Sequence, residues 1–163
     1  MIKKISSGLV VFAGMVSLPG AVSQHQAELP RQAPAPAAGQ RPDYRLACLQ
    51  KFFARASCPA LPLASIFLEA ADDYHLDWRL LPSLSFVESG GGKAAPNNNL
   101  FGWDCGRAHF DSFAAGIHHV GFHLAHRPPY RHKNVAGILA SYNSNPEYAQ
   151  KVTSVMRQIA PTE

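Results

Sequence analysis

The sequence predicts a mainly α protein. Apolar residues recur at helical spacing in several segments, and no segment alternates apolar and polar residues as a half-buried strand does. The chain has 163 residues, of which 47% are apolar and 16% charged, which suffices for one domain with its own core. The low charged fraction argues against a coiled coil and against disorder along the whole chain.

The helices follow from the apolar stripes and from cap residues. Ala-, Leu- and Phe-rich stripes predict helices over residues 44–56, 62–75, 79–89 and 135–142. Two further helices begin at cap residues, one at Asp111 or Ser112 and the last at Asn145-Pro146. Gly90-Gly91-Gly92 ends the third helix. Residues 93–110 are expected to form a loop, with at most one small hairpin around 97–110.

The N-terminus has the features of a secretory signal. Lys3 and Lys4 precede the mostly apolar stretch 5–18, and the small residues Ala21 and Ser23 suit a cleavage site at residue 23. An uncleaved membrane anchor is the alternative. Residues 24–42 are rich in Pro, Ala and Gln and predict a linker, followed by one domain over 43–160. We expect an exported monomer in the periplasm, the cell wall or the medium, without a membrane span after processing.

Charge and cysteine content narrow the function classes. Cleavage removes two of the 15 Lys and Arg and leaves 13 − 11 = +2, with no basic stripe, so nucleic-acid binding is not expected. The three cysteines are Cys48, Cys58 and Cys105. A helix between Cys48 and Cys58 would hold them too far apart to bridge. A Cys58–Cys105 bridge and three free thiols both remain open.

Glu88 is the most informative single residue. It continues the apolar stripe of its helix, four residues after Leu84, and it lies at the helix C-terminus. Burial and the helix dipole both disfavour a carboxylate there, and a general acid needs the raised pKa that results. We expect Glu88 to be largely buried and to open into the main groove. The alternatives are a pairing with an arginine or a side chain turned to solvent.

The loop after Glu88 carries amides and aromatic rings. The amides of Asn97-Asn98-Asn99 suit sugar hydroxyls and acetamido groups. Phe101 is expected to fill the core beneath the loop. Trp103 fits a core position and a sugar-stacking position equally well.

Ordered motifs in this region carry a family resemblance. The segments are Phe86-Val87-Glu88-Ser89-Gly90-Gly91-Gly92, Asn99-Leu100-Phe101-Gly102, Tyr142-Asn143 and Pro146-Glu147-Tyr148-Ala149. Together they resemble the glucosaminidase family of cell-wall hydrolases, over residues 65–159. Tyr142-Asn143 is also similar to a segment of lytic transglycosylases. The resemblance implies a lysozyme-like helical domain with a groove that binds the glycan strands of peptidoglycan.

The resemblance also implies roles for residues. Glu88 would protonate the glycosidic oxygen, and Tyr142 would stabilise the sugar cation or orient the acetamido group. The residues expected to bind substrate are Ser89, Asn98, Asn99, Phe101, Trp103, Asp104 and Asn143. No second acid is required by the motifs: Asp104 and Asp111 are the nearest candidates, and assistance by the acetamido group is the other route. A lytic transglycosylase and a non-catalytic wall-binding protein are the alternative functions.

Other chemistries are not favoured, and no cofactor is expected. His118, His119, His123 and His126 lie within one predicted helix. No Glu stands between His119 and His123, so the zinc-protease motif is missing. Cys105 has His109 nearby, but no third partner or oxyanion site is indicated, so a thiol nucleophile is not predicted.

Overall fold

The computed structural model describes residues 43–161. The predicted signal at 1–23 and the predicted linker at 24–42 lie outside the described residues. Every statement about the fold below concerns 43–161.

The described part of the chain is helical and contains no strand, which confirms the predicted class. The elements are α1 Tyr44–Arg55, α2 Ala64–Asp73, α3 Leu80–Ser89, α4 Phe113–His126, α5 Val135–Tyr142 and α6 Pro146–Ile159, with 3₁₀ turns at Leu61–Leu63 and Pro96–Asn98. Residues 97–110, where the sequence allowed at most a small hairpin, are built from turns.

The helix ends are fixed where the sequence places cap residues. The Ser112 side chain accepts a hydrogen bond from the amide of Ala115 at 3.1 Å, so Ser112 and not Asp111 caps α4. Asn145 caps α6 in the same way, accepting from the amide of Glu147 at 2.9 Å. At the end of α3, Gly90 takes the left-handed conformation, with φ +65°.

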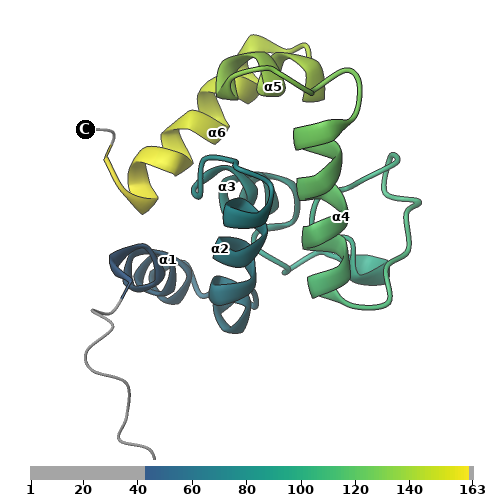
Figure 1. Cartoon of the computed structure of the whole chain (residues 1–163). Coiled ribbons are helices and arrows are strands. Elements are labelled where there is room, and N and C mark those ends of the chain that lie inside the picture. The colour runs from purple at the N-terminus through teal and green to yellow at the C-terminus, as the bar shows by residue number, and fades with distance from the viewer. Residues whose placement is uncertain (1–42, 162–163) are drawn as a thin grey trace, which may run out of the picture. The chain divides into compact units, whose positions relative to one another are not determined.

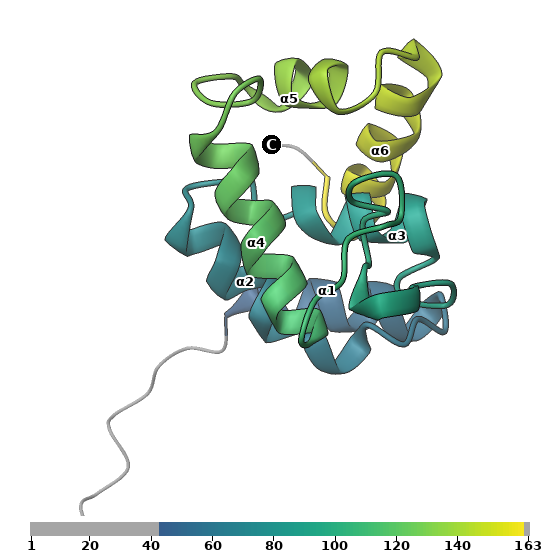
Figure 2. The same ribbon diagram turned by 90° about the vertical axis from the view of Figure 1, so that its right-hand side faces the viewer.

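Helix α3 runs through the middle of the molecule and is surrounded by the other helices (Figures 1 and 2). It packs against α6 and α2, while α2 also packs against α4 and α1, and α5 against α6. The sequence of α3 explains its position, because its single charged residue is Glu88 and seven of its ten residues are buried. A helix that is apolar nearly all round is stable only inside the core. Its C-terminal end therefore brings Glu88 out of the core at a defined place.

A glycine allows the close approach of α2 and α4. A Cβ on Gly121 of α4 would come within 2.7 Å of the Tyr74 ring, which follows α2 directly. No side chain fits at that distance, so the ring lies directly on the helix backbone. The contact fixes the side of α4 that faces away from α2, where His119 and His123 contact the loop after α3.

The three cysteines are free thiols, and of the two alternatives left by the sequence this is the one that the structure adopts. Cys58 is buried, and burial raises its pKa. Cys105 is exposed.

Candidate active site

Glu88 lies at the C-terminal end of α3, as predicted, but it is not buried. It is the only exposed residue of that helix, and it lines a cleft in the described part of the chain. The expectation of a largely buried carboxylate is therefore wrong. The stripe that buries Leu81 and Leu84 stops short of Glu88, which stands on the last turn of α3 just before the left-handed glycines turn the chain away.

One carboxylate oxygen of Glu88 is held by a tyrosine. The hydroxyl of Tyr148, on the first turn of α6, donates to Glu88 Oε1 at 2.6 Å. This length is at the short end of the range for a hydrogen bond between two oxygens. Burial and, next, the bond to Glu88 raise the pKa of Tyr148 well above its ordinary value, so the hydroxyl keeps its proton. The other oxygen, Oε2, accepts no hydrogen bond from any described residue.

Gly102 brings the loop backbone against that second oxygen. Its φ is +58°, a conformation that glycine adopts without strain. A Cβ at this position would lie 3.3 Å from Glu88 Oε2. The glycine of the Asn99–Gly102 motif therefore meets two requirements at once, because it provides a left-handed turn and leaves space beside the carboxylate.

The cleft has a volume of about 630 Å³. It is lined by Glu88, Phe101, Gly102, Trp103, Asp104, Cys105, Tyr130, Tyr142 and Asn143. These residues come from the end of α3, from the loop before α4, from the turn after α4 and from the end of α5. Segments far apart in the sequence thus form one concave surface around Glu88.

Aromatic rings form one wall of the cleft. The Trp103 and Tyr130 rings lie 6.1 and 6.4 Å, centroid to centroid, from the Tyr142 ring. The Tyr142 ring in turn stacks on Tyr148 at 5.8 Å and 7°. The Tyr142 hydroxyl donates to the carbonyl of Phe101 at 2.7 Å. Burial and, next, the charge of Glu88 raise the pKa of Tyr142 above its usual range. The phenol therefore stays neutral and ties α5 to the loop that carries Gly102.

Three residues expected to bind substrate do not line the cleft. Ser89 is buried, and its hydroxyl donates to the carbonyl of Ser85 and accepts from the amide of Gly92. Asn99 is buried, donates to the carbonyls of Trp103 and Ala108, and accepts from the amide of Trp103. These bonds hold the loop in shape.

Asn98 is the third of them. Its amide donates to the carbonyl of Phe110 at 2.8 Å. The sequence shows that three asparagines stand together in a loop, but it does not show which way an amide points. In a loop with few regular backbone hydrogen bonds, the amides bond to that backbone instead.

The remaining predicted residues lie in the cleft. The Phe101 ring is in the core, as expected, so its backbone rather than its ring faces the Tyr142 hydroxyl. Trp103 is half-buried and lies on the cleft side of the loop. Asn143 is exposed and follows Tyr142 directly. These residues, together with Glu88, are the part of the predicted site that the fold brings together.

Only one other carboxylate lines the cleft among the described residues. Asp104 is exposed, has φ +53° and pairs with Arg107 at 2.8 Å. Asp111 is exposed, precedes the cap of α4 and is not in the cleft.

The four histidines of α4 do not form a cluster of their own. His119 and His123 stack at 4.5 Å and pack edge-on against Trp103. Burial, then His119 and Arg127, lower the pKa of His123. His118 instead lies beside Glu69 and Asp73, and these three offer ligand atoms within 4.8 Å of one another. None of the three lines the cleft.

The comparison with protein families agrees with the geometry. A model of the family described as mannosyl-glycoprotein endo-beta-N-acetylglucosaminidase matches residues 64–161, more than half of the chain. The chain belongs to the glucosaminidase family. No curated protein and no solved structure matched the chain. Membership makes it, in general terms, a peptidoglycan-degrading glycosidase, with an extracytoplasmic location indicated.

The structure adds two residues to the candidate site that the sequence analysis did not assign to it. The apolar stripe of α6 places Tyr148 in the core, where it lies, but its hydroxyl also reaches Glu88. Its place in the Pro146–Ala149 motif was the available signal. Tyr130 carries no motif at all, and nothing in its neighbourhood in the sequence marks it. No helix in the described part is both long and apolar enough to cross a membrane.

Proposed function

We propose that this glucosaminidase domain cleaves the β-1,4 bonds of the amino-sugar backbone of peptidoglycan, with Glu88 as the general acid. The observation that carries the proposal is the arrangement of the Glu88 carboxylate. Tyr148 holds Oε1, and Oε2 is left beside Gly102 without a protein partner. A proton on Oε2 is then free to pass to the glycosidic oxygen of a bound strand.

The bond breaks as the leaving oxygen takes that proton, and positive charge develops on the neighbouring sugar ring. The ring must be stabilised from the side away from the acid. Asp104 is exposed and paired with Arg107, which favours assistance by the acetamido oxygen of the substrate. The electron-rich face and neutral phenol of Tyr142 line the same cleft and supply further stabilisation of the cation.

Substrate contacts come from the aromatic wall and the cleft rim. Trp103 and Tyr130 offer ring faces on which sugars stack, and Asn143 offers an amide at the exposed end of α5. An extended cleft with several ring faces suits a polymer, so we propose cleavage within the strand. Export through the N-terminal signal would bring the domain to this substrate.

The same geometry supports a second candidate, a lytic transglycosylase. A cleft with one unpaired carboxylate lacks an obvious residue to activate water, and a hydroxyl of the sugar itself can then close onto the cation. The two reactions differ by one water molecule in the product. The fragments released from purified peptidoglycan are analysed by mass spectrometry before and after reduction with borohydride. Their masses separate hydrolysis from transglycosylation.

The fragments also identify the bond. A glucosaminidase leaves N-acetylglucosamine at the new reducing end and a product that has gained one water. An anhydro end would establish the transglycosylase, and N-acetylmuramic acid at the reducing end would establish cleavage of the other bond. Binding to peptidoglycan without any released fragment would leave a non-catalytic wall-binding protein.

A further inference from the structure

The turn between α4 and α5 carries cations that the mechanism does not use. We call residues 127–133 the basic turn; its cations are Arg127, Arg131 and Lys133. All three side chains are exposed. None of them forms a salt bridge with an aspartate or glutamate of the described residues. Arg45, Arg79 and Arg107 each pair with an aspartate, and the other cations without an acid partner in the described residues are spread over α1, the loop after α3 and α6.

The fold attaches the basic turn to the cleft wall. The amides of Tyr130 and Arg131 donate to the carbonyl of Arg127 at 2.9 and 3.1 Å, which winds the turn tightly around Tyr130. Tyr130 lines the cleft between Trp103 and Tyr142. The basic turn is therefore continuous with the cleft wall at Tyr130, and Arg131 follows that residue directly.

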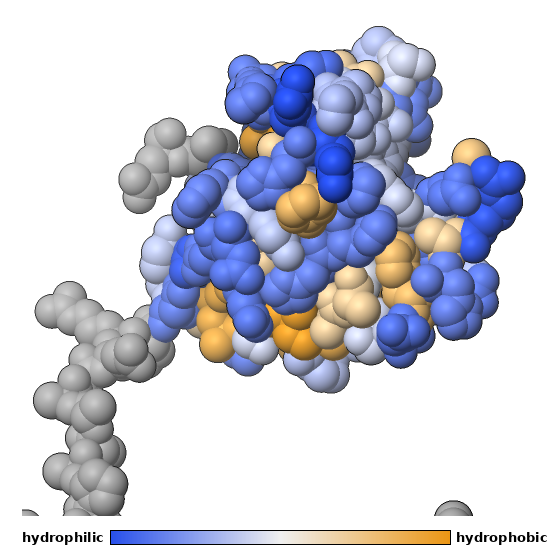
Figure 3. Space-filling model, turned by 45° about the vertical axis from the view of Figure 1, so that its right-hand side comes forward, coloured by the Kyte–Doolittle hydropathy of each residue, from blue (hydrophilic) through white to orange (hydrophobic). Residues whose placement is uncertain are grey.

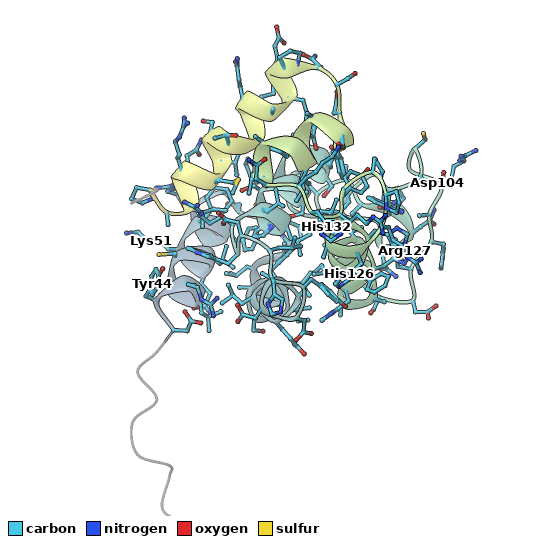
Figure 4. All side chains as sticks on the ribbon, turned by 45° about the horizontal axis from the view of Figure 1, so that its top comes forward. Tyr44, Lys51, Asp104, His126, Arg127 and His132 are labelled. Carbon is cyan, nitrogen blue, oxygen red and sulfur yellow. The ribbon has the colours of Figure 1, made fainter. Side chains whose placement is uncertain are left out.

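Two further contacts fix the positions of these charges. The Lys133 amine donates to the hydroxyl of Ser141 at 2.6 Å, and Ser141 immediately precedes the cleft residue Tyr142. The Arg127 guanidinium lies over the Phe122 ring on α4, 5.5 Å from its centroid. In Figure 4, Arg127, His126 and His132 gather on the same side of the view as the cleft residue Asp104, opposite Tyr44 and Lys51. Figure 3 shows a face of the molecule that is mostly hydrophilic, with several hydrophobic patches between the hydrophilic residues.

We propose that the basic turn binds the free carboxylates of the peptide branches on the glycan strand, so that the enzyme prefers strands that carry charged peptides. This inference rests on the proposed function, because it takes the cleft to hold a peptidoglycan strand. The N-acetylated backbone sugars in a peptide-bearing strand are neutral. The peptide branches project from the strand and end in carboxylates, which unpaired arginine and lysine side chains at the cleft edge can bind.

The test compares one substrate in two charge states. Soluble peptide-bearing glycan strands are used either as they are or with their carboxylates converted to methylamides, and kcat/KM is measured on both. Exposed ion pairs contribute little each, so two or three of them should raise the wild-type value roughly five- to tenfold on the charged strands at low salt. The ratio should fall toward one at about 0.5 M salt, where screening acts within a few ångströms.

Variants assign the preference to the basic turn. The double variant Arg127→Gln/Arg131→Gln should bring the ratio of the two kcat/KM values below roughly two. The pair Arg131→Gln/Lys133→Gln is a second route, should the loss of Arg127 from its place over the Phe122 ring disturb folding. Lys51→Gln on α1 is the control, and its ratio should stay at the wild-type value.

Equal wild-type kcat/KM on the two strands, or an unchanged ratio in both double variants, would overturn the inference. Strands stripped of peptide by an amidase keep a lactyl carboxylate on the sugar. If kcat/KM on these stripped strands equals kcat/KM on the charged peptide-bearing strands, the basic turn does not bind the peptide. Failure of the proposed function is distinct, because the wild type would then cleave neither the charged nor the neutral strands.

Discussion

The Tyr148 hydroxyl donates to Glu88 Oε1 at 2.6 Å, joining the first turn of α6 to the last turn of α3 across 60 residues of sequence. The bond leaves Oε2 beside Gly102 without a hydrogen bond from any described residue, and in the proposed mechanism this is the oxygen that meets the substrate. Tyr148 lies behind the cleft and does not line it, so its role is to position the acid.

Tyr148→Phe should lower kcat and leave KM nearly unchanged. If the orientation of the acid is lost, kcat should fall roughly ten- to hundredfold, which corresponds to about 1.4–2.7 kcal/mol of lost transition-state stabilisation. Steady-state kinetics on soluble glycan strands measure it. Tyr74→Phe removes a hydroxyl bonded to His118 instead and should leave kcat at the wild-type value. A Tyr148→Phe enzyme with the wild-type kcat would show that the hydroxyl does not position the acid.

Gly102→Ala should impair activity more than stability. The new Cβ would stand 3.3 Å from Glu88 Oε2 and push the carboxylate from its place, which should cost about tenfold in kcat/KM. The left-handed backbone adds about 1–2 kcal/mol of strain to any residue with a side chain. Gly106→Ala is the matched control, because its φ is +80° and nothing lies within 4 Å of its Cβ. Equal activity losses in the two variants would show that only backbone strain matters.

Asn99→Ala should destabilise the fold. The side chain makes three hydrogen bonds to the loop while buried, and leaving such groups unpaired costs about 1–3 kcal/mol in the free energy of unfolding. Urea unfolding measures this loss, with exposed Gln150→Ala as control. If Asn99 bound sugar instead, KM would rise while the free energy of unfolding stayed constant.

The buried tyrosines predict a loss of stability at alkaline pH. In the folded protein the pKa values of Tyr142 and Tyr148 lie above the ordinary value of 10.0. Above that pH the unfolded chain loses protons that the folded chain retains. The free energy of unfolding therefore falls as the pH rises past about 10, and stability is fully present below it.

Urea unfolding at pH 8 and at pH 11 measures this dependence. Tyr148→Phe should unfold with a smaller difference between the two pH values than the wild type, and exposed Tyr44→Phe with the same difference. A free energy of unfolding that does not change between the two pH values would mean that the phenols ionise as freely in the folded protein as in the unfolded chain.

The fold was predictable because its signals are local. Ser112, Asn145 and Gly90 cap helices through bonds and dihedral angles set within a few residues, and the apolar runs identify the buried faces. The position of Glu88 at a helix end follows from the glycines after it. Its exposure does not, because it depends on how α5, α6 and the loop before α4 pack around the end of α3.

Residues of the candidate site were predictable only where a single short segment of the sequence determines their position. The segment Asn99–Gly102 predicts a loop beside Glu88. The direction of the Asn99 side chain, however, depends on the carbonyls of Trp103 and Ala108, which only the folded loop brings within reach. The contact between Tyr148 and Glu88 is longer in range still, and the apolar stripe of α6 by itself marks Tyr148 as a core residue. Tyr130 reaches the cleft because the turn between α4 and α5 carries it there, and no local pattern in the sequence marks it.

The central claim is that Glu88 is the acid, and Glu88→Gln tests it most directly. The amide keeps the size of the side chain and can still accept from Tyr148, but it cannot deliver a proton. The measurement is the rate at which purified peptidoglycan releases soluble fragments, with urea unfolding as the check that the variant folds. We predict a loss of about 10²–10⁴-fold, the contribution of a general acid, with the free energy of unfolding close to wild type. A folded Glu88→Gln enzyme that releases fragments near the wild-type rate would contradict the account.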